Sequence, residues 1–319
     1  MSVINSLYNY GIVPVVKIDD AGKAVSLAKA LSDGGLPCVE ITFRTAAGKQ
    51  AIRNISESTP EILVGAGTVL TTAQVDEALD AGAKFIVAPG LNCDVVEHCT
   101  QRGVPVFPGC ASPSDIEKAL RMGLDAVKFF PAESLGGVDY LKAVSAPYGN
   151  VRFMPTGGVN EKNLSSYLAL DSVVACGGTW MVKDELINSG KFDEITALAK
   201  SAVKAVMGFQ FAHIGINTES NDEALKAARK FEILFGFEIK AGSSSVFAGS
   251  GINFLSRRDI EKSGYVGIFT NNVIRAKHYL ERGGFEFAED AAETNPSGKP
   301  TAIFLKEEIA GFAVRIMQK

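Results

Sequence analysis

Ala126-Val127-Lys128-Phe129-Phe130-Pro131 has the pattern of a buried β-strand with a lysine in its middle. Side chains alternate along a strand, so Lys128 shares one face with Ala126 and Phe130. Strand and helix patterns recur on both sides of this stretch, and sheets built that way are covered by protein on both faces. Burial there disfavours the ammonium and favours the neutral amine, which is a nucleophile for carbonyl carbon. The alternative is a lysine that pairs with a buried carboxylate for structural reasons only.

Strand-like segments recur at regular spacing around this one. Each is followed by a polar or glycine-bearing turn and a helix-like segment, which predicts a closed (β/α)8 TIM barrel over about 200 residues. An open, doubly wound sheet is the competing architecture. The dinucleotide fingerprint that would favour it is poor, because Leu70 stands where the third glycine belongs. The eight segments begin near Ile12, Cys38, Ile62, Phe85, Val104, Ala126, Val151 and Ser172.

Several polar residues fall at the carboxyl ends of these strands, where barrel enzymes hold their catalytic groups. Glu40 is out of phase with Val39 and Ile41, so it is predicted to point inward. Arg44 and Thr68 follow the second and third strands, and Pro89 follows the fourth. A lone inward glutamate could be only the structural partner of Lys128. The arginine, threonine and proline at the same rim favour a functional site.

Two glycine pairs follow the last two predicted strands, in Thr156-Gly157-Gly158 and Gly177-Gly178-Thr179. Paired glycines allow backbone N–H groups to approach a ligand, and the loops after strands seven and eight of many barrels hold a phosphate. The alternative is that the glycines only form tight turns. Two such loops side by side, each with a threonine hydroxyl, favour an anion site.

The sequence also resembles a known family from about residue 4 to residue 206. The motifs that carry the resemblance are Glu40 with Arg44, Val64-Gly65-Ala66-Gly67-Thr68-Val69, Ala88-Pro89-Gly90, Val127-Lys128-Phe129-Phe130-Pro131-Ala132-Glu133, Met154-Pro155-Thr156-Gly157-Gly158 and Gly177-Gly178-Thr179-Trp180. They are similar to those of the 2-keto-3-deoxy-6-phosphogluconate (KDPG) aldolases, a family that includes 4-hydroxy-2-oxoglutarate (KHG) aldolase activity. Phe43 stands where the family commonly has leucine, and Thr179 where it has serine.

The resemblance implies a class I lyase of the Entner–Doudoroff pathway that needs no metal or cofactor and is usually a homotrimer. It implies that Lys128 forms a Schiff base with a 2-keto acid and that Glu40 moves protons. The remaining expected roles are carboxylate binding by Arg44 and Thr68, a pocket wall at Pro89, Thr156 near the substrate hydroxyls, and phosphate binding by Gly157, Gly158, Gly178 and Thr179. KHG cleavage, cleavage of the phosphogalactonate epimer and a catalytically idle binding protein are the alternatives.

Residues 209–319 do not belong to the predicted barrel, which spans 1–208. Ala212-His213-Ile214-Gly215-Ile216-Asn217-Thr218 repeats as Gly264-Tyr265-Val266-Gly267-Ile268-Phe269-Thr270. The repeat resembles paired βαβββ modules of the glyoxalase/bleomycin-resistance (vicinal oxygen chelate) superfamily, a smaller α+β domain. Only His213 of the four usual ligand positions suits a metal; Tyr265 and Arg315 occupy two others, which predicts no metal site. His213 is expected to be a hydrogen-bonded core residue, and the domain to serve assembly or to bind a small acidic ligand through Arg315.

Composition sets the broader limits. Lys and Arg number 32 against 36 Asp and Glu, and no long basic run occurs, so neither nucleic acid nor an anionic membrane is an expected partner. The first residues lack the pattern of a signal peptide. Five cysteines without a Cys-x-x-Cys pair indicate free thiols. These features predict a cytoplasmic enzyme.

Overall fold

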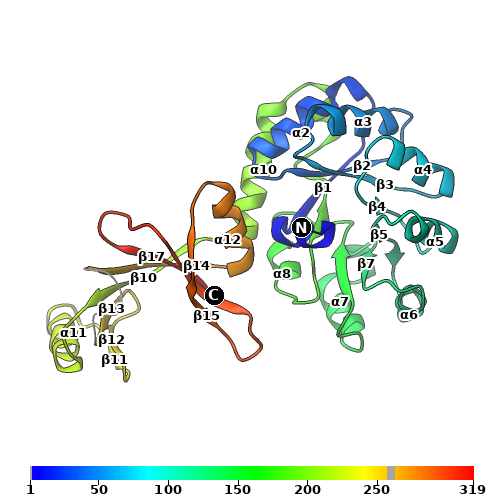
Figure 1. Cartoon of the computed structure of the whole chain (residues 1–319). Coiled ribbons are helices and arrows are strands. Elements are labelled where there is room, and N and C mark those ends of the chain that lie inside the picture. Colours follow the sequence, from blue (N-terminus) through cyan, green and yellow to red (C-terminus); the bar gives the residue numbers. More distant parts are fainter. Residues whose placement is uncertain (1, 257–262) are drawn as a thin grey trace. The chain divides into compact units, whose positions relative to one another are not determined.

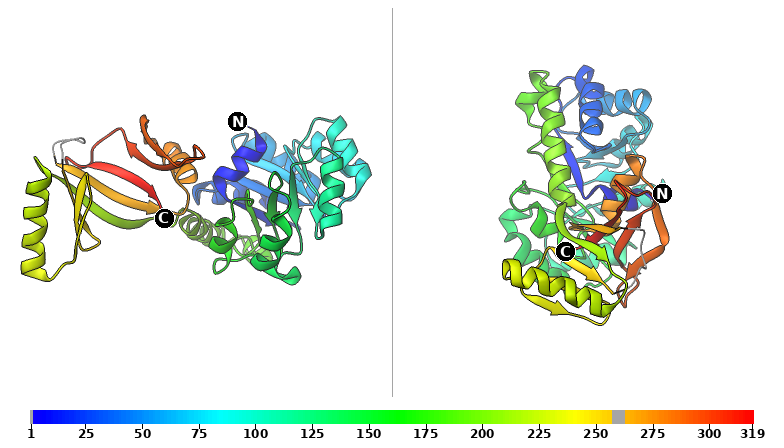
Figure 2. Two further views of the ribbon diagram at one scale, coloured as in Figure 1. Left: turned by 90° about the horizontal axis from the view of Figure 1, so that it is seen from below. Right: turned by 90° about the vertical axis from the view of Figure 1, so that its left-hand side faces the viewer.

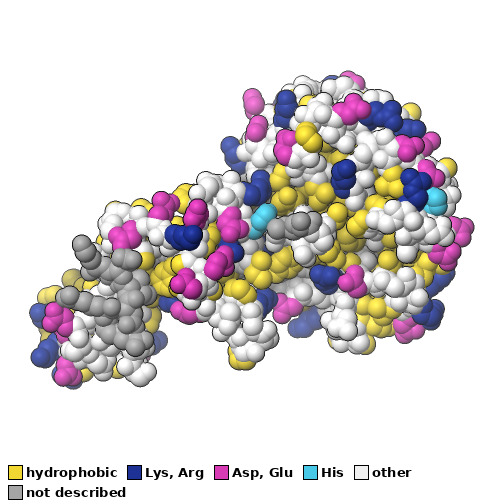
Figure 3. All heavy atoms as spheres, viewed as in Figure 1, with side chains coloured by type: hydrophobic (Ala, Val, Ile, Leu, Met, Phe, Trp, Pro, Cys, Tyr) yellow, Lys and Arg dark blue, Asp and Glu magenta, His cyan; other side chains and the backbone are white. Residues whose placement is uncertain are grey.

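The computed structural model describes residues 2–256 and 263–319. The chain divides into two compact units, Met1–Val206 and Met207–Lys319, and each is described by itself. Figure 1 labels their elements, and Figure 2 gives two further views. On the face that Figure 3 presents, Lys and Arg side chains are interspersed with Asp and Glu. Among the described residues, no helix combines the length and apolarity that a membrane crossing needs.

The first unit is an α/β barrel whose strands all run parallel. They are β1 (Ile12–Val16), β2 (Cys38–Thr42), β3 (Leu63–Gly67), β4 (Ile86–Val87), β5 (Val106–Phe107), β6 (Gly109–Cys110), β7 (Ala126–Phe129), β8 (Arg152–Pro155) and β9 (Cys176–Gly178). The hydrogen-bonded orders are β5-β4-β3-β2-β1-β9 and β6-β7-β8. Single bridges from Phe153 to Val173 and from Thr156 to Gly177 join β8 to β9, which closes the ring.

Two details of the ring differ from the predicted strands. The fifth strand is broken into β5 and β6 at Pro108, which has no N–H to donate, although its carbonyl accepts the Lys128 N–H at 2.9 Å. The last strand begins at Cys176 rather than near Ser172. The other predicted starts lie within two residues of the observed ones. The open-sheet alternative is wrong, because β9 pairs with β1.

Helices connect successive strands, and α2 through α7 lie outside them (Figure 1). The segments are α1 (Val3–Tyr10), η1 (Ala21–Lys23), α2 (Ala24–Asp33), α3 (Gly48–Ser58), α4 (Thr72–Asp80), α5 (Cys93–Gln101), α6 (Pro113–Arg121), η2 (Glu133–Leu135), α7 (Gly137–Ser145), α8 (Leu164–Leu168), α9 (Asp184–Asn188) and α10 (Phe192–Met207). Thr71, Asn92 and Ser112 cap helices by accepting a first-turn N–H.

An apolar core fills part of the barrel and holds the strands that carry the polar residues. Its buried members come from α1, from several strands and from the segment before β9: Leu7, Val13, Phe85, Val87, Phe107, Ala126, Met154, Val174 and Ala175. Phe85 and Phe107 meet edge to face, with ring centroids 6.2 Å apart. This core packs beside the strands whose carboxyl ends carry the polar side chains.

The described residues of the second unit form a mixed eight-stranded sheet and two helices. Its elements are β10 (Gln210–Asn217), α11 (Asn221–Phe235), β11 (Ile239–Ala241), β12 (Ser245–Ala248), β13 (Ile252–Leu255), β14 (Gly264–Thr270), α12 (Val273–Arg282), β15 (Phe287–Thr294), β16 (Pro300–Leu305) and β17 (Ala313–Gln318). The strand order is β11-β12-β13-β10-β14-β17-β16-β15, with β10 and β14 antiparallel at its centre.

One face of this sheet is covered by helix. Ala224 and Ala228 of α11 pack on Val246, Ala248 and Phe254, and α11 lies beside β11, β12 and β13 in both figures. Alternation therefore places the neighbouring residues of β12 and β13 on the opposite face.

Candidate active site

Lys128 and Glu40 face each other inside the barrel, from β7 and β2. Nζ of Lys128 lies 3.8 Å from Oε1 of Glu40, and their side chains are only 7% and 1% exposed. Nζ also lies 5.1 Å from the centroid of the Phe130 ring, on the same face of the strand. The predicted juxtaposition of amine and carboxylate is therefore present in a nearly dry setting.

Glu40 is held by packing rather than by hydrogen bonds. Among the described residues, neither of its carboxylate oxygens has a hydrogen-bond partner, although both are buried. A Cβ added to Gly67 would lie 2.7 Å from the Glu40 Cγ and Cδ, so the side chain lies directly over this glycine. A buried carboxylate without donors is costly, and such a group is typical of a site that handles protons.

A cavity of about 300 Å³ opens above this pair. Arg44, Thr68 and Pro89 line it after β2, β3 and β4. Thr68 has a left-handed backbone, with φ of 57°, which is uncommon for a β-branched residue and costs about 1–3 kcal/mol. The cavity also contains residues that the sequence did not single out as site residues, Val15 and Val159.

The two glycine-bearing loops meet at the same cavity. Thr156, Gly157, Gly158 and Thr179 line it, and both Gly157 and Gly158 have positive φ, 97° and 86°, so glycine is required there. Gly178 does not line it. A Cβ at Gly178 would lie 2.7 Å from Cε3 of Trp180, so this glycine makes room for the indole.

Glu133 packs against the loop that carries Gly158 and donates a hydrogen bond to it. A Cβ at Gly158 would lie 2.5 Å from Cγ of Glu133, and the Glu133 N–H donates to the Gly157 carbonyl at 3.0 Å. The buried Tyr167 hydroxyl donates to the Glu133 carboxylate. Burial, followed by this hydrogen bond and charge, raises the pKa of Tyr167, which remains protonated. The Gly157–Gly158 backbone is thus fixed by side chains from η2 and α8.

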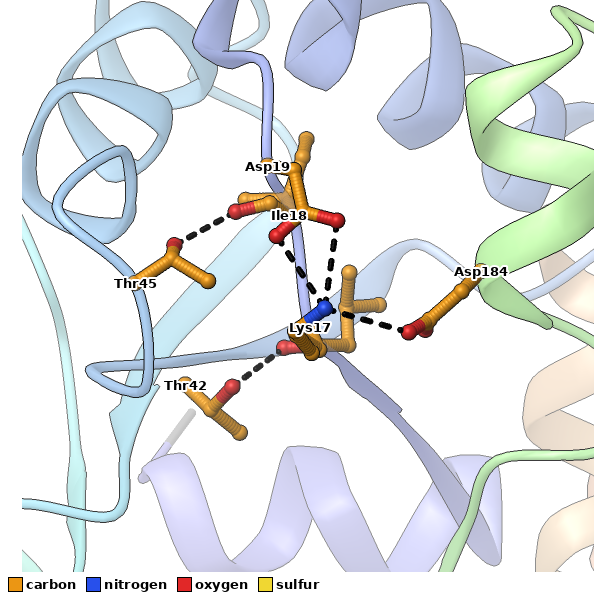
Figure 4. Close-up of polar contacts among 7 residues, drawn as sticks. Lys17, Ile18, Asp19, Thr42, Thr45 and Asp184 are labelled. Carbon is orange, nitrogen blue, oxygen red and sulfur yellow. Dashed lines mark hydrogen bonds and ion pairs between the residues drawn. The ribbon is translucent and has the colours of Figure 1, made fainter.

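A more open extension of about 530 Å³ continues from the cavity and shares Arg44, Gly158 and Thr179 with it. Lys17, just after β1, lines this extension and was missed by the sequence analysis. Its Nζ donates to Asp19 at 3.1 Å and to Asp184 at 3.4 Å, as Figure 4 shows. The hydrogen bonds to these carboxylates raise the pKa of Lys17, so it is a cation. The one sequence feature that could have identified Lys17 as a site residue was its position at the carboxyl end of β1.

The second unit holds the predicted first-strand histidine in a hydrogen bond. Nε2 of His213 lies 2.6 Å from the Tyr265 hydroxyl, and the imidazole is 7% exposed. Burial first, and the Arg315 charge second, lower the pKa of His213. The expectation of a hydrogen-bonded core histidine is confirmed. Within residues 2–256 and 263–319, no three His, Cys, Asp or Glu side chains gather as a metal site would require.

The first unit is similar in sequence to known aldolases. The family described as KDPG and KHG aldolase matches residues 3–198. The 2-dehydro-3-deoxy-phosphogluconate aldolase of Treponema pallidum is 46% identical over 206 residues, 65% of this chain and 98% of that protein. The KHG/KDPG aldolase of Escherichia coli K12 is 42% identical over 193 residues, 60% of this chain and 91% of that protein.

Solved structures of KDPG aldolases are also similar to the first unit. The KDPG aldolase of Legionella pneumophila, with pyruvate captured at low pH as a covalent carbinolamine intermediate, is 36% identical with a TM-score of 0.61. The similarity covers 63% of this chain and 98% of that one. The Zymomonas mobilis enzyme with 3-phosphoglycerate is 39% identical, with a TM-score of 0.59, over 63% of this chain and 95% of that one.

Proposed function

The chain belongs to the KDPG and KHG aldolase family and is a carbon–carbon lyase, and we propose that it cleaves KDPG through an imine on Lys128. The products are pyruvate and glyceraldehyde 3-phosphate. The observation that carries the proposal is the buried Lys128–Glu40 pair, 3.8 Å apart at the floor of a cavity in a barrel whose relatives are KDPG aldolases.

The reaction needs a nucleophile, an electron sink and a proton carrier. The Lys128 amine adds to the C2 ketone, and loss of water from the carbinolamine gives a protonated imine. The C4 hydroxyl then loses its proton, and the C3–C4 bonding electrons move into the imine. The aldehyde leaves, and the pyruvate enamine is protonated at C3. Hydrolysis of the resulting imine releases pyruvate and restores the lysine.

Glu40 is the proton carrier for these steps. Its oxygens have no partner among the described residues, so they can accept a proton without breaking a hydrogen bond. The 3.8 Å separation from Nζ exceeds a direct hydrogen bond, which favours transfer through a substrate hydroxyl or a water between them.

Different groups around the cavity bind the two ends of the substrate. Arg44 and Thr68 hold the pyruvate carboxylate, for which the planar guanidinium fork is well suited, and Pro89 forms the wall. Thr156 lies near the hydroxylated carbons. Backbone donors of Gly157 and Gly158, the Thr179 hydroxyl and the loop at Gly178 bind the phosphate. Lys17 lies in the extension of the cavity, where its charge is paired with Asp19 and Asp184.

Borohydride reduction in the presence of pyruvate tests the imine. The reduced adduct should map to a peptide that contains Lys128 and should be absent from Lys128→Ala. Lys84→Ala is the matched control, because Lys84 is an exposed lysine just before β4, at the amino ends of the strands. An adduct on any other lysine contradicts the assignment. Chelators should leave turnover unchanged, because the imine already supplies the electron sink.

A panel of 2-keto acids tests the substrate. The E. coli relative is a KHG/KDPG aldolase, so KHG is the second candidate substrate, and the phosphogalactonate epimer is a third. Removing the phosphate should lower kcat/KM more than tenfold, which corresponds to about 1.4 kcal/mol. Equal efficiency with and without phosphate favours the KHG activity.

We also propose that residues 209–319 are a pair of glyoxalase-like βαβββ modules and that the enzyme is a cytoplasmic homotrimer. The internal repeat and the strand order, which is symmetric about the β10–β14 pair, support the first point. The family resemblance supports the second. The molar mass of the assembly that the full chain forms in solution tests the trimer.

A further inference from the structure

A polar cluster on one sheet face of the second unit is not used by the aldolase chemistry. It consists of His213, Asn253, Tyr265 and Arg315, from the adjacent strands β10, β13, β14 and β17. Gly215 pairs with Asn253 and with Tyr265, and Gly267 pairs with His213 and with Arg315. Paired residues share a face, as do residues two apart on a strand, so all four side chains lie on one face. This face is opposite the one that α11 covers, because Phe254, next to Asn253, packs on α11.

The Tyr265 hydroxyl is the centre of the cluster, and its hydrogen-bonding capacity is full. Neutral His213 can accept the hydroxyl proton through Nε2, at 2.6 Å. Nδ2 of Asn253 and Nη1 of Arg315 each donate to the same oxygen at 3.4 Å. A hydroxyl has one proton to donate and two lone pairs to accept with, and all three are used. Gly215 makes room for the ring, since a Cβ there would lie 2.7 Å from the Tyr265 Cζ.

This arrangement leaves two buried polar atoms without partners among the described residues, Oδ1 of Asn253 and Nε of Arg315. Nδ2 of Asn253 donates to the Tyr265 hydroxyl, so Oδ1 of the same amide points elsewhere and can accept a hydrogen bond. Asn253 is 95% buried, since its exposed fraction is 5%. Unpartnered buried polar atoms cost stability, and this pair, one acceptor and one donor, suits a ligand that carries both a donor and an acceptor.

The geometry of the Arg315 guanidinium indicates which acceptor group the ligand carries. Its Nη2 donates to the Glu293 carboxylate, while Nε, on the same edge of the guanidinium, donates to no described residue. A carboxylate fits the Nε–Nη2 edge with two parallel hydrogen bonds, of which Glu293 makes one. Glu293 is 55% exposed and Arg315 is 18% exposed, so the glutamate can move into water when another carboxylate takes its place. Phe304 and Tyr265 flank the guanidinium, with their ring centroids 5.6 and 5.4 Å from its central carbon.

We propose that this face of the second unit binds a small 2-hydroxycarboxylate. The carboxylate accepts from Nε and Nη2 of Arg315 in place of Glu293, and the adjacent hydroxyl donates to Oδ1 of Asn253. None of these residues lines the barrel cavity, and the site needs no metal ion.

Titration calorimetry of the full chain with lactate tests this proposal. The titrated protein carries Arg44→Ala, so that the arginine proposed to bind a carboxylate in the barrel cannot bind lactate. We expect saturable binding at one site per chain, with a Kd on the order of 1 mM for so small a ligand. Arg315→Gln should weaken binding at least tenfold. Propionate, which lacks the hydroxyl, should bind several-fold more weakly than lactate, and Asn253→Ala should remove that difference.

Glu293→Gln distinguishes a binding site from a purely structural ion pair. Removal of the competing internal carboxylate should tighten lactate binding about threefold, within the range of partly exposed ion pairs. If Arg315→Gln does not fold by circular dichroism, Arg315→Lys replaces it, because lysine keeps the charge but loses the two-nitrogen edge. No saturable binding up to about 20 mM would mean that water occupies the unpartnered atoms, and the proposal would be wrong. Binding unaffected by either Arg315 substitution would overturn it equally.

Discussion

Gly67→Ala should impair catalysis by displacing Glu40, although every proposed catalytic residue is retained in the sequence. The added methyl would overlap Oε1 of Glu40 and lie 2.7 Å from its Cγ and Cδ, distances that real side chains do not tolerate. Glu40 comes from the neighbouring strand β2, whose backbone is fixed by pairing with β1 and β3. The Glu40 side chain must therefore change conformation, which alters the position of its carboxylate relative to Lys128.

The size of the effect follows from the role of the displaced group. A positioned acid–base residue contributes on the order of 10²–10⁴-fold. Because the carboxylate is moved rather than deleted, we expect the lower end, about 10² in kcat, which is ~2.7 kcal/mol of barrier. KM should change little, since the atoms nearest to the added methyl belong to Glu40 and the side chains of Arg44 and Thr68 are retained.

Gly65→Ala is the matched control on the same strand. Its Cβ would lie 2.5 Å from Cε1 of Phe85 and closer still to Cζ, so the strain falls on the apolar core. This variant should lower the melting temperature and leave kcat per folded molecule near the wild-type value. Pyruvate release and thermal melting should be measured on both. If Gly67→Ala retains kcat within threefold of wild type with Glu40 intact, the assignment of Glu40 as proton carrier is refuted.

Three further predictions concern other groups. Tyr167→Phe removes the hydrogen bond to Glu133 beneath the Gly157–Gly158 backbone, so KM for the phosphorylated substrate should rise about threefold to tenfold with kcat nearly unchanged in steady-state assays. Burial lowers the pKa of His213 below 6.5, so its stabilising contribution is complete above about pH 6.5 and is lost as pH falls toward the folded value; NMR titration should show this pKa, and Arg315→Gln should raise it. Burial raises the pKa of the Cys110 thiol to about 12, so iodoacetamide at about pH 8 should label it only after unfolding, which peptide mass spectrometry detects; labelling of the native protein contradicts this.

Strand alternation and the order of strands made much of the barrel site predictable. Lys128 and Glu40 were expected to point inward, and the structure brings both to one cavity with Arg44, Thr68 and Pro89. In a closed parallel ring, the carboxyl ends of all strands meet at one rim, so spacing along the chain is enough to gather such residues.

Features that depend on particular tertiary neighbours could not be predicted. A glycine pair does not reveal what each glycine makes room for, and at Gly178 this is the ring of Trp180. Lys17 was missed because a lysine after a strand resembles any solvated charge. The Glu293 partner of Arg315 could not be predicted either, because it comes from β15, a strand that is not adjacent to β17 in the sheet.

The pairing of the first and last barrel strands also bears on how the chain folds during synthesis. β1 bonds to β9, so the ring cannot close until Cys176–Gly178 has left the ribosome, but no strand of the second unit is needed for closure. The second sheet has the opposite constraint, because its central strand β14 pairs with β17, at Ala313–Gln318. The nascent aldolase barrel can therefore complete its own strand pairing while more than 100 residues remain to be translated, and translation pauses after residue 206 should spare it.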